Sequence, residues 1–190
     1  MKKRVMVPEL LGDLVKSGLN AMEGVQFSDP GRCPRCGGQV RGYDIRERIF
    51  VSLVENKTRR DIRVKVKRFE CRECGKVSEA KAPFYPFAHY GAPVVDFAIG
   101  LSRIMPYRRA AKVLRACHID LNWGTIRLYS RSKITSVPSL EIFGIPVPVS
   151  LLNLSILGTQ LGQFGTIVGA EAFAACCPPP ADRTPLYPGA

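Results

Sequence analysis

Two Cys-x-x-Cys-Gly motifs constrain this chain more than any other feature of its sequence. They are residues 33–37 (Cys-Pro-Arg-Cys-Gly) and residues 71–75 (Cys-Arg-Glu-Cys-Gly). Each spacing suits a tight turn that presents two thiolates to one metal ion, and the glycine allows the positive φ that such a turn requires. Four thiolates complete a tetrahedral site with no open position, so we predict one structural zinc ion. Its ligands are Cys33, Cys36, Cys71 and Cys74.

Other interpretations of the cysteines remain open at this point. Four thiolates can also hold iron. A Cys-x-x-Cys motif can be redox-active, although a redox motif needs no matched partner. The chain has seven cysteines, and those left over from the two pairs do not resemble a secreted disulfide framework. A reducing cytoplasm therefore fits the chain better than an exported state.

The positive charge of the chain is regional. Its net charge is +12, and all but one of its 28 Lys and Arg residues precede residue 141. A basic region of this kind favours a polyanionic partner, most often nucleic acid. We therefore expect double-stranded DNA as the partner, with a homodimer as an open alternative to a monomer, and a cytoplasmic, nucleoid-associated location.

Residues 31–79 have the pattern of a zinc ribbon, in which a β-hairpin carries both metal-binding turns. Residues 48–54 and 60–69 are predicted strands, joined by the polar turn 55–58. The second strand alternates apolar and cationic residues, the period of a half-buried strand, until the alternation slips at Arg68-Phe69, where we predict a β-bulge. The apolar set is Ile62, Val64 and Val66, and the cationic set is Arg63, Lys65 and Lys67. We expect the cations to contact DNA phosphates, the alternative being a solvated edge that deters aggregation.

Four helices are predicted around this ribbon. The first covers residues 8–23 within an N-terminal segment, residues 1–30. Residues 80–92 are a predicted aromatic linker. The other three helices follow this linker, over residues 93–105, over residues 107–117 and after Asn122. Asn122 can cap the last helix by accepting from the N–H of Thr125. The residues expected to face inward are Val94, Phe97, Leu101 and Ile104, then Tyr107, Ala110, Val113, Leu114 and Cys117, then Trp123, Ile126 and Tyr129.

Residues 93–136 have the pattern of a helix-turn-helix. Two short helices are joined by a tight turn, and the second of them carries outward Thr and Arg side chains. Such a helix fits the major groove, where Arg can read guanine. The alternative is an ordinary helical hairpin with a solvated basic face. The predicted DNA contacts are Arg108, Arg109, Lys112, Asn122, Thr125, Arg127 and Arg131, with Arg63, Lys65 and Lys67 of the ribbon.

The order of these modules resembles the N-terminal half of insertion-sequence transposases. The resemblance covers roughly residues 30–135: a four-cysteine ribbon, a basic strand entering the second Cys-x-x-Cys, and a helix-turn-helix ending in Thr-Ile-Arg-x-Tyr. It implies that the cysteines hold zinc and that residues 107–133 recognise the terminal inverted repeats. Transposases of this type join strands with an acidic triad on an RNase H-like domain. The only acidic residues after residue 140 are Glu141, Glu171 and Asp182. We therefore expect no transposition chemistry from this chain.

The segment 137–190 is apolar and rich in Pro and Gly. No charged residue occurs between residues 142 and 170, but prolines and glycines interrupt the run. We expect an irregular tail, as in a truncated or frameshifted reading frame, with a membrane anchor or a buried apolar helix as alternatives.

The expected architecture is therefore α+β: an N-terminal helix, a zinc ribbon, a three-helix helix-turn-helix and this tail. The expected function is zinc-dependent, sequence-specific DNA binding, as the end-recognition part of a transposase that lacks its catalytic domain. A transcription regulator, an intact strand-cleaving enzyme and a membrane-attached binding protein are the rival functions.

Overall fold

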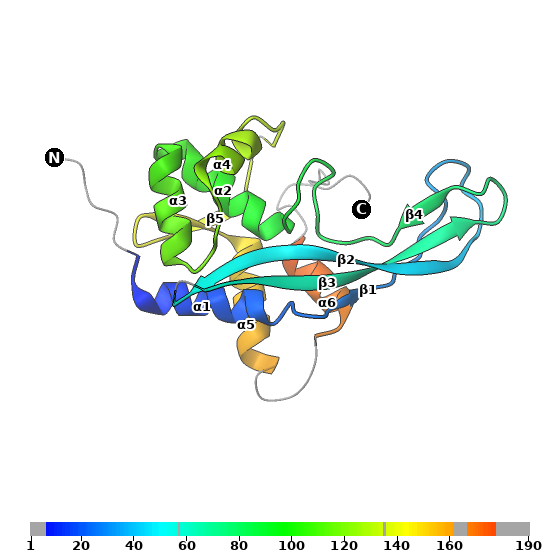
Figure 1. Ribbon diagram of the computed structural model, residues 1–190, viewed down its shortest axis with the longest axis horizontal. Coiled ribbons are helices and arrows are strands. Elements are labelled where there is room, and N and C mark those ends of the chain that lie inside the picture. Colours follow the sequence, from blue (N-terminus) through cyan, green and yellow to red (C-terminus); the bar gives the residue numbers. More distant parts are fainter. Residues whose placement is uncertain (1–6, 57, 135, 162–166, 178–190) are drawn as a thin grey trace.

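A long antiparallel hairpin of β2 (Val40–Glu55) and β3 (Thr58–Cys71) runs along the molecule (Figure 1). The computed structural model describes residues 7–56, 58–134, 136–161 and 167–177. β1 (Gln26–Phe27) pairs with β3 in parallel, and β4 (Val77–Glu79) pairs with it antiparallel. The strands predicted over 48–54 and 60–69 are parts of this hairpin, because pairing continues from the turn to Cys71.

The described residues also form six helices and a second, two-stranded sheet, so the fold is α+β as predicted. The predicted helices over residues 8–23, 93–105 and 107–117 are confirmed. The helices are α1 (Glu9–Asn20), α2 (Ala92–Ile104), α3 (Tyr107–Ala116), α4 (Trp123–Ser130), α5 (Val149–Leu161) and α6 (Gly169–Cys176). The second sheet pairs β5 (Ser139–Ile142) with β6 (Ile145–Pro148).

One face of β3 contributes to the hydrophobic core. Ile62, Val64 and Val66 are fully buried, while Arg63 and Lys65 are exposed, which confirms the predicted alternation. These three side chains belong to one hydrophobic core that also takes in buried side chains of α1, α2 and α5. In Figure 1, α2, α3 and α4 lie on one side of the hairpin and α1 lies on the other.

The hairpin leaves this core towards the cysteines. The side chains of residues 41–47 are all exposed, and the end of the hairpin beyond them projects from the body of the molecule (Figure 1). The register shifts between Gly42, which pairs with Phe69, and Asp44, which pairs with Arg68, so Tyr43 is the extra residue. The bulge predicted at Arg68-Phe69 therefore lies on the opposite strand. Opposite the bulge Phe69 is buried, although β2 is exposed on both sides of Tyr43.

Helix α2 is the centre of the helical part. Every residue from Ala92 to Leu101 is buried, and α2 contacts α3, α4, α5 and β6. A helix that is apolar all round is buried all round, and its one carboxylate, on Asp96, accepts a 2.7 Å hydrogen bond from the hydroxyl of Tyr85. The inward position predicted for Ile104 is wrong, because α2 ends there and Ile104 is exposed, while Met105 is extended and buried.

Helix α4 packs on α2 through Ile126 and Tyr129, which are buried as predicted. The predicted cap is confirmed: Asn122 Oδ1 accepts from the Thr125 N–H at 2.9 Å. The inward position predicted for Trp123 is wrong, because the Trp123 side chain is 45% exposed. The helix has only two turns, and its inner face is already filled by the two residues that meet α2.

The irregular tail predicted for residues 137–190 is wrong for residues 139–161 and 167–177. These residues form β5, β6, α5 and α6, and Leu151 and Leu154 of α5 are fully buried. The apolar composition that suggested an unselected reading frame is the composition of a core helix. Residues 162–166 and 178–190 lie outside the described residues.

Helices α1 and α5 cross with their backbones in near contact. A Cβ atom added to Gly18 would lie 2.6 Å from the backbone nitrogen of Ser155. On the facing helix, a Cβ added to Gly158 would lie 3.1 Å from the Cα of Gly18. The absence of both side chains therefore sets how closely α5 approaches α1.

This crossing predicts opposite effects for two helical glycines. Gly18→Ala should destabilise the fold by about 1–3 kcal/mol through overpacking, because its new methyl group meets backbone. Gly100→Ala, in α2, is the matched control, since its methyl would meet Pro146 at an ordinary 3.6 Å and helix propensity would gain about 1 kcal/mol. Thermal unfolding monitored by circular dichroism measures both, and equal midpoints for the two variants would contradict the crossing.

Candidate functional site

The four predicted cysteines meet at the projecting end of the hairpin. Their sulfur atoms all lie within 4.8 Å of one another, so the cluster could hold one metal ion. Cys33 Sγ lies 3.6 Å from Cys74 Sγ, and Cys36 Sγ lies 3.4 Å from Cys71 Sγ. A tetrahedral zinc site with Zn–S bonds of about 2.3 Å separates its sulfur atoms by about 3.8 Å. The cluster is therefore close to the size that such an ion requires.

The two halves of the cluster repeat the same backbone turn. The N–H of Gly37 donates to Cys33 O at 2.9 Å, and the N–H of Gly75 donates to Cys71 O at 3.1 Å. Both glycines have positive φ, 72° and 68°, which a side chain would strain. This is the conformation that the sequence pattern predicted for the glycines.

Strand pairing brings the two turns together. Val40 pairs with Cys71 at the end of the β2–β3 ladder, and the Arg72 N–H donates to Gln39 O at 2.9 Å. An ion pair between Arg41 and Glu70 follows at 2.6 Å on the next rung. Two motifs that are distant in the sequence are thus held in register by the hairpin before any ion is considered.

Backbone N–H groups favour a thiolate at Cys33 of this cluster. The N–H groups of Cys36 and Arg35 lower the pKa of the Cys33 thiol to about 6. At Cys36 the backbone of Gly38 lowers the pKa, but the Cys71 thiol and desolvation outweigh it and raise the pKa to about 12. Cys33 therefore forms a thiolate readily, whereas a cation bound by the cluster would favour ionisation of Cys36.

The predicted cations of β3 differ in what surrounds them. Arg63 lies 3.9 Å from the carboxylate of Asp61, and the ammonium of Lys67 lies 5.5 Å from the ring centre of Phe69, where its side chain is half-buried. Lys65 is exposed and pairs across the ladder with Glu47. Lys65 is therefore the most available of the three.

Helices α3 and α4 place most of the other predicted contacts on exposed surface. Arg108 and Lys112 are exposed on α3, and Arg127 and Arg131 are exposed on and just after α4. Arg109 and Thr125 are half-buried at the flanks. Asn122 is exposed, but its side-chain oxygen is engaged as the helix cap.

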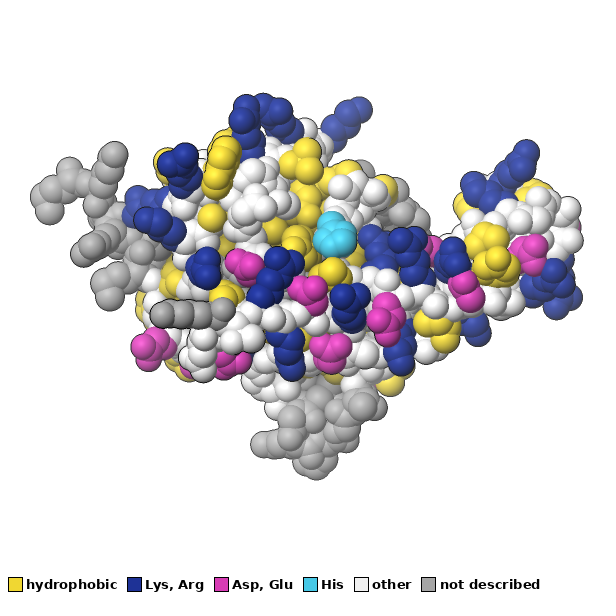
Figure 2. Space-filling model, in the orientation of Figure 1, with side chains coloured by type: hydrophobic (Ala, Val, Ile, Leu, Met, Phe, Trp, Pro, Cys, Tyr) yellow, Lys and Arg dark blue, Asp and Glu magenta, His cyan; other side chains and the backbone are white. Residues whose placement is uncertain are grey.

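The α3–α4 cations are short of acidic neighbours. Among the residues that the structure describes, no carboxylate oxygen lies within 4.0 Å of the charged nitrogens of Arg108, Lys112, Arg127 or Arg131. Figure 2 shows Lys and Arg side chains gathered over the α3–α4 region, with hydrophobic side chains between them, whereas basic and acidic side chains alternate along the hairpin. We call the exposed face of these two helices the α3–α4 basic surface.

Three residues of the α3–α4 basic surface were not among the predicted contacts. Arg115 is exposed on α3, and its spacing from Arg108 and Lys112 could have revealed it. Leu128 and Trp123 on α4 are 62% and 45% exposed. The outward position of Leu128 follows from helical periodicity, but that of Trp123 depends on where α4 begins.

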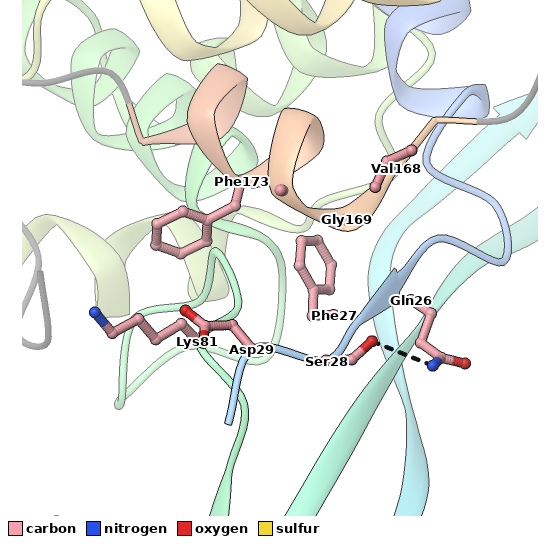
Figure 3. A pocket seen from close by; sticks show the side chains of 9 residues that line it. Gln26, Phe27, Ser28, Asp29, Lys81, Val168, Gly169 and Phe173 are labelled. Carbon is pink, nitrogen blue, oxygen red and sulfur yellow. Dashed lines mark hydrogen bonds between the residues drawn. The ribbon is translucent and has the colours of Figure 1, made fainter. Parts of the chain in front are cut away.

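Two cavities lie away from these surfaces. The first, of about 390 Å³, is lined by residues of β1, α6 and Lys81. Figure 3 shows the rings of Phe27 and Phe173 beside it and a hydrogen bond between Gln26 Nε2 and Ser28 Oγ, which measures 3.2 Å. The second, of about 540 Å³, lies between α1, the β2–β3 turn and His118. Sequence analysis indicated neither of them.

Cys117 and His118 lie in structural surroundings. Cys117 is fully buried, as predicted for a core residue, and burial raises its pKa to about 12. His118 Nδ1 lies 3.3 Å from Val54 O in the connection between α3 and α4. No helix among the described residues is long and apolar enough to cross a lipid bilayer.

Comparison with known families gives one match. Residues 33–112 match a family described as a domain of unknown function (DUF6431). The match begins at the first cysteine of the cluster and ends within α3, so it covers less than half of the chain. The chain matches no curated protein and no solved structure. The matched residues include the four cysteines, the hairpin and α2, and the description of the family assigns no activity.

The cluster predicts metal binding that depends on its four thiols. Purified protein should carry about one ion per chain by elemental analysis. Cys36→Ser should lose that ion and lower the thermal midpoint, because three thiolates hold zinc less tightly than four. Cys177→Ser is the control, because the Cys177 thiol is half-buried and lies outside the cluster. This variant should keep the metal. If removal of the metal from wild-type protein leaves its thermal midpoint unchanged, the prediction of a structural metal site is wrong.

Proposed function

We propose that this chain is a zinc-dependent protein that binds double-stranded DNA with sequence specificity. The observation that carries the proposal is the α3–α4 basic surface, in which exposed Arg108, Lys112, Arg127 and Arg131 have no carboxylate within ion-pair distance among the described residues. Exposed cations in folded proteins commonly pair with acids or mix with them. A one-signed surface of this kind suits a polyanion.

The arrangement of α2, α3 and α4 supports a helix-turn-helix mode of binding. The three helices pack on one another, and Asn122 caps the last of them. In this mode α4 enters the major groove, with Arg127 and Arg131 approaching base edges and the cations of α3 contacting phosphates. The inner residues Ile126 and Tyr129 fix α4 on α2, so the cationic face is presented rigidly.

The hairpin has a supporting role in this proposal. Zinc bound by the cysteine cluster holds the projecting end of the hairpin together. Lys65 contributes a phosphate contact. Arg63 and Lys67 contribute less, because Asp61 and Phe69 already engage them. Zinc is preferred over iron because a closed set of four thiolates on two Cys-x-x-Cys turns is typical of structural zinc sites.

The order of the modules favours end recognition in a transposase as the biological setting. A transcription regulator uses the same modules and is the alternative. Electrophoretic mobility shift assays with duplexes that flank the gene distinguish the two settings. Binding to inverted repeats at both ends favours the transposase, whereas binding to a single site upstream of a promoter favours the regulator. Neither setting assigns strand-transfer chemistry to this chain.

The proposal predicts different effects for two cations. After selection of a preferred site from random duplexes, Arg131→Ala should lose about 1–3 kcal/mol of binding to that site and little to random DNA. Lys65→Ala should weaken both alike and reduce the salt dependence by about one ion. Fluorescence anisotropy of labelled duplexes at several salt concentrations measures both.

Arg41→Ala is the matched control for Arg131→Ala. Arg41 is exposed but paired with Glu70, so its loss should change neither affinity nor specificity by more than about twofold. Wild-type protein that binds no duplex at physiological salt would overturn the proposed function. Equal losses for Arg131→Ala on selected and random DNA would remove Arg131 from the base-reading residues.

A further inference from the structure

Two large apolar side chains lie among the cations of the α3–α4 basic surface. Leu128 is 62% exposed and Trp123 is 45% exposed, although neighbouring Ile126 and Tyr129 are buried. Leu128 lies one residue after Arg127 and three before Arg131, so helical geometry places all three on the outward side of α4. The guanidinium of Arg108 lies 5.6 Å from the ring centre of Trp123.

The surroundings of these side chains decide what they fit. In a protein–protein interface a polar rim surrounds the apolar centre, and the charges of the two partners are complementary. The rim here is formed by Arg108, Arg127 and Arg131, and no carboxylate lies within ion-pair distance of them in the part of the chain that the structure describes. A nucleic acid surface complements that rim, but phosphates and most base edges offer nothing to a Leu side chain.

The major groove offers one apolar group, the C5 methyl of thymine. We propose that Leu128 and Trp123 read thymine methyl groups beside the bases contacted by Arg127 and Arg131. This inference rests on the proposed function and adds the base that the apolar part of α4 selects. The sequence recognised by the protein then contains thymine next to guanine, and removal of a single methyl group lowers affinity.

The test replaces thymines with deoxyuridine, which lacks only the methyl group. In the duplex selected by the wild-type protein, each thymine is replaced in turn and affinity is measured by anisotropy. At least one replacement should weaken wild-type binding about fourfold, the effect of one buried methyl group. Leu128→Ala should lose the response to at least one of the replacements that weaken wild-type binding, and the exposed position of Leu128 should leave the thermal midpoint unchanged.

Leu10→Ala is the matched control, because Leu10 is 78% exposed and belongs to α1, which is not part of the α3–α4 basic surface. It should keep the full wild-type response to deoxyuridine. The inference is overturned if the selected site contains no thymine, if wild-type protein is indifferent to every replacement, or if Leu128→Ala retains the wild-type response to all of them. Each of these results leaves DNA binding itself intact, whereas absence of any binding would reject the proposed function instead.

Trp123 gives a second, independent readout, because it is the one tryptophan of the chain. Saturating selected duplex should quench or shift its emission, and the uracil duplex that binds most weakly should change it less at equal occupancy. Unchanged emission at saturation, with occupancy established by anisotropy, would remove Trp123 from the thymine contact. Changes in oligomeric state on Leu128→Ala would show that a second copy of the chain, rather than DNA, occupies this patch, and would likewise overturn the inference.

Discussion

The pairing of β2 with β3 is the constraint on which the rest of the molecule depends. At one end its register sets Val40 opposite Cys71 and thereby gathers the four thiols. Further along, the same ladder turns Ile62, Val64 and Val66 into one buried face. A slip of one residue would move those three side chains to solvent and separate the cysteine turns at the same time. Core packing and metal geometry therefore select the same register.

Local patterns predicted the parts of this structure that local chemistry determines. The two Cys-x-x-Cys-Gly turns, the strand alternation and the Asn122 cap each depend on a few neighbouring residues, and each is observed. The bulge at Tyr43 could be located only approximately, because the slip in β3 shows that the alternation breaks there and not which strand takes the extra residue. Trp123 was misplaced for a related reason, since its direction depends on tertiary packing of a two-turn helix. The DNA contacts and the identity of the metal remain predictions.

The C-terminal helices show where composition misleads. A stretch without charge, broken by Pro and Gly, has the look of an unselected tail, yet Gly158 is the residue that lets α5 approach Gly18 of α1. Nothing in either segment alone indicates the other, because the contact joins the two ends of the chain. The apolar face of α2 has the same explanation: it is covered on every side by elements that the sequence does not place next to it.

Strand β2 also joins two distant parts of the molecule. Near its turn end, Ser52 O accepts the Asp120 N–H and the Val54 N–H donates to His118 O, both at 2.8 Å, within the connection that precedes α4. Its other end borders the cysteine cluster. A single continuous strand thus links the cysteine cluster to the segment that precedes α4, and the angle between them depends on the coiling of the β2–β3 hairpin. The spacing between the two ends of the molecule is a property of strand geometry rather than of a flexible tether.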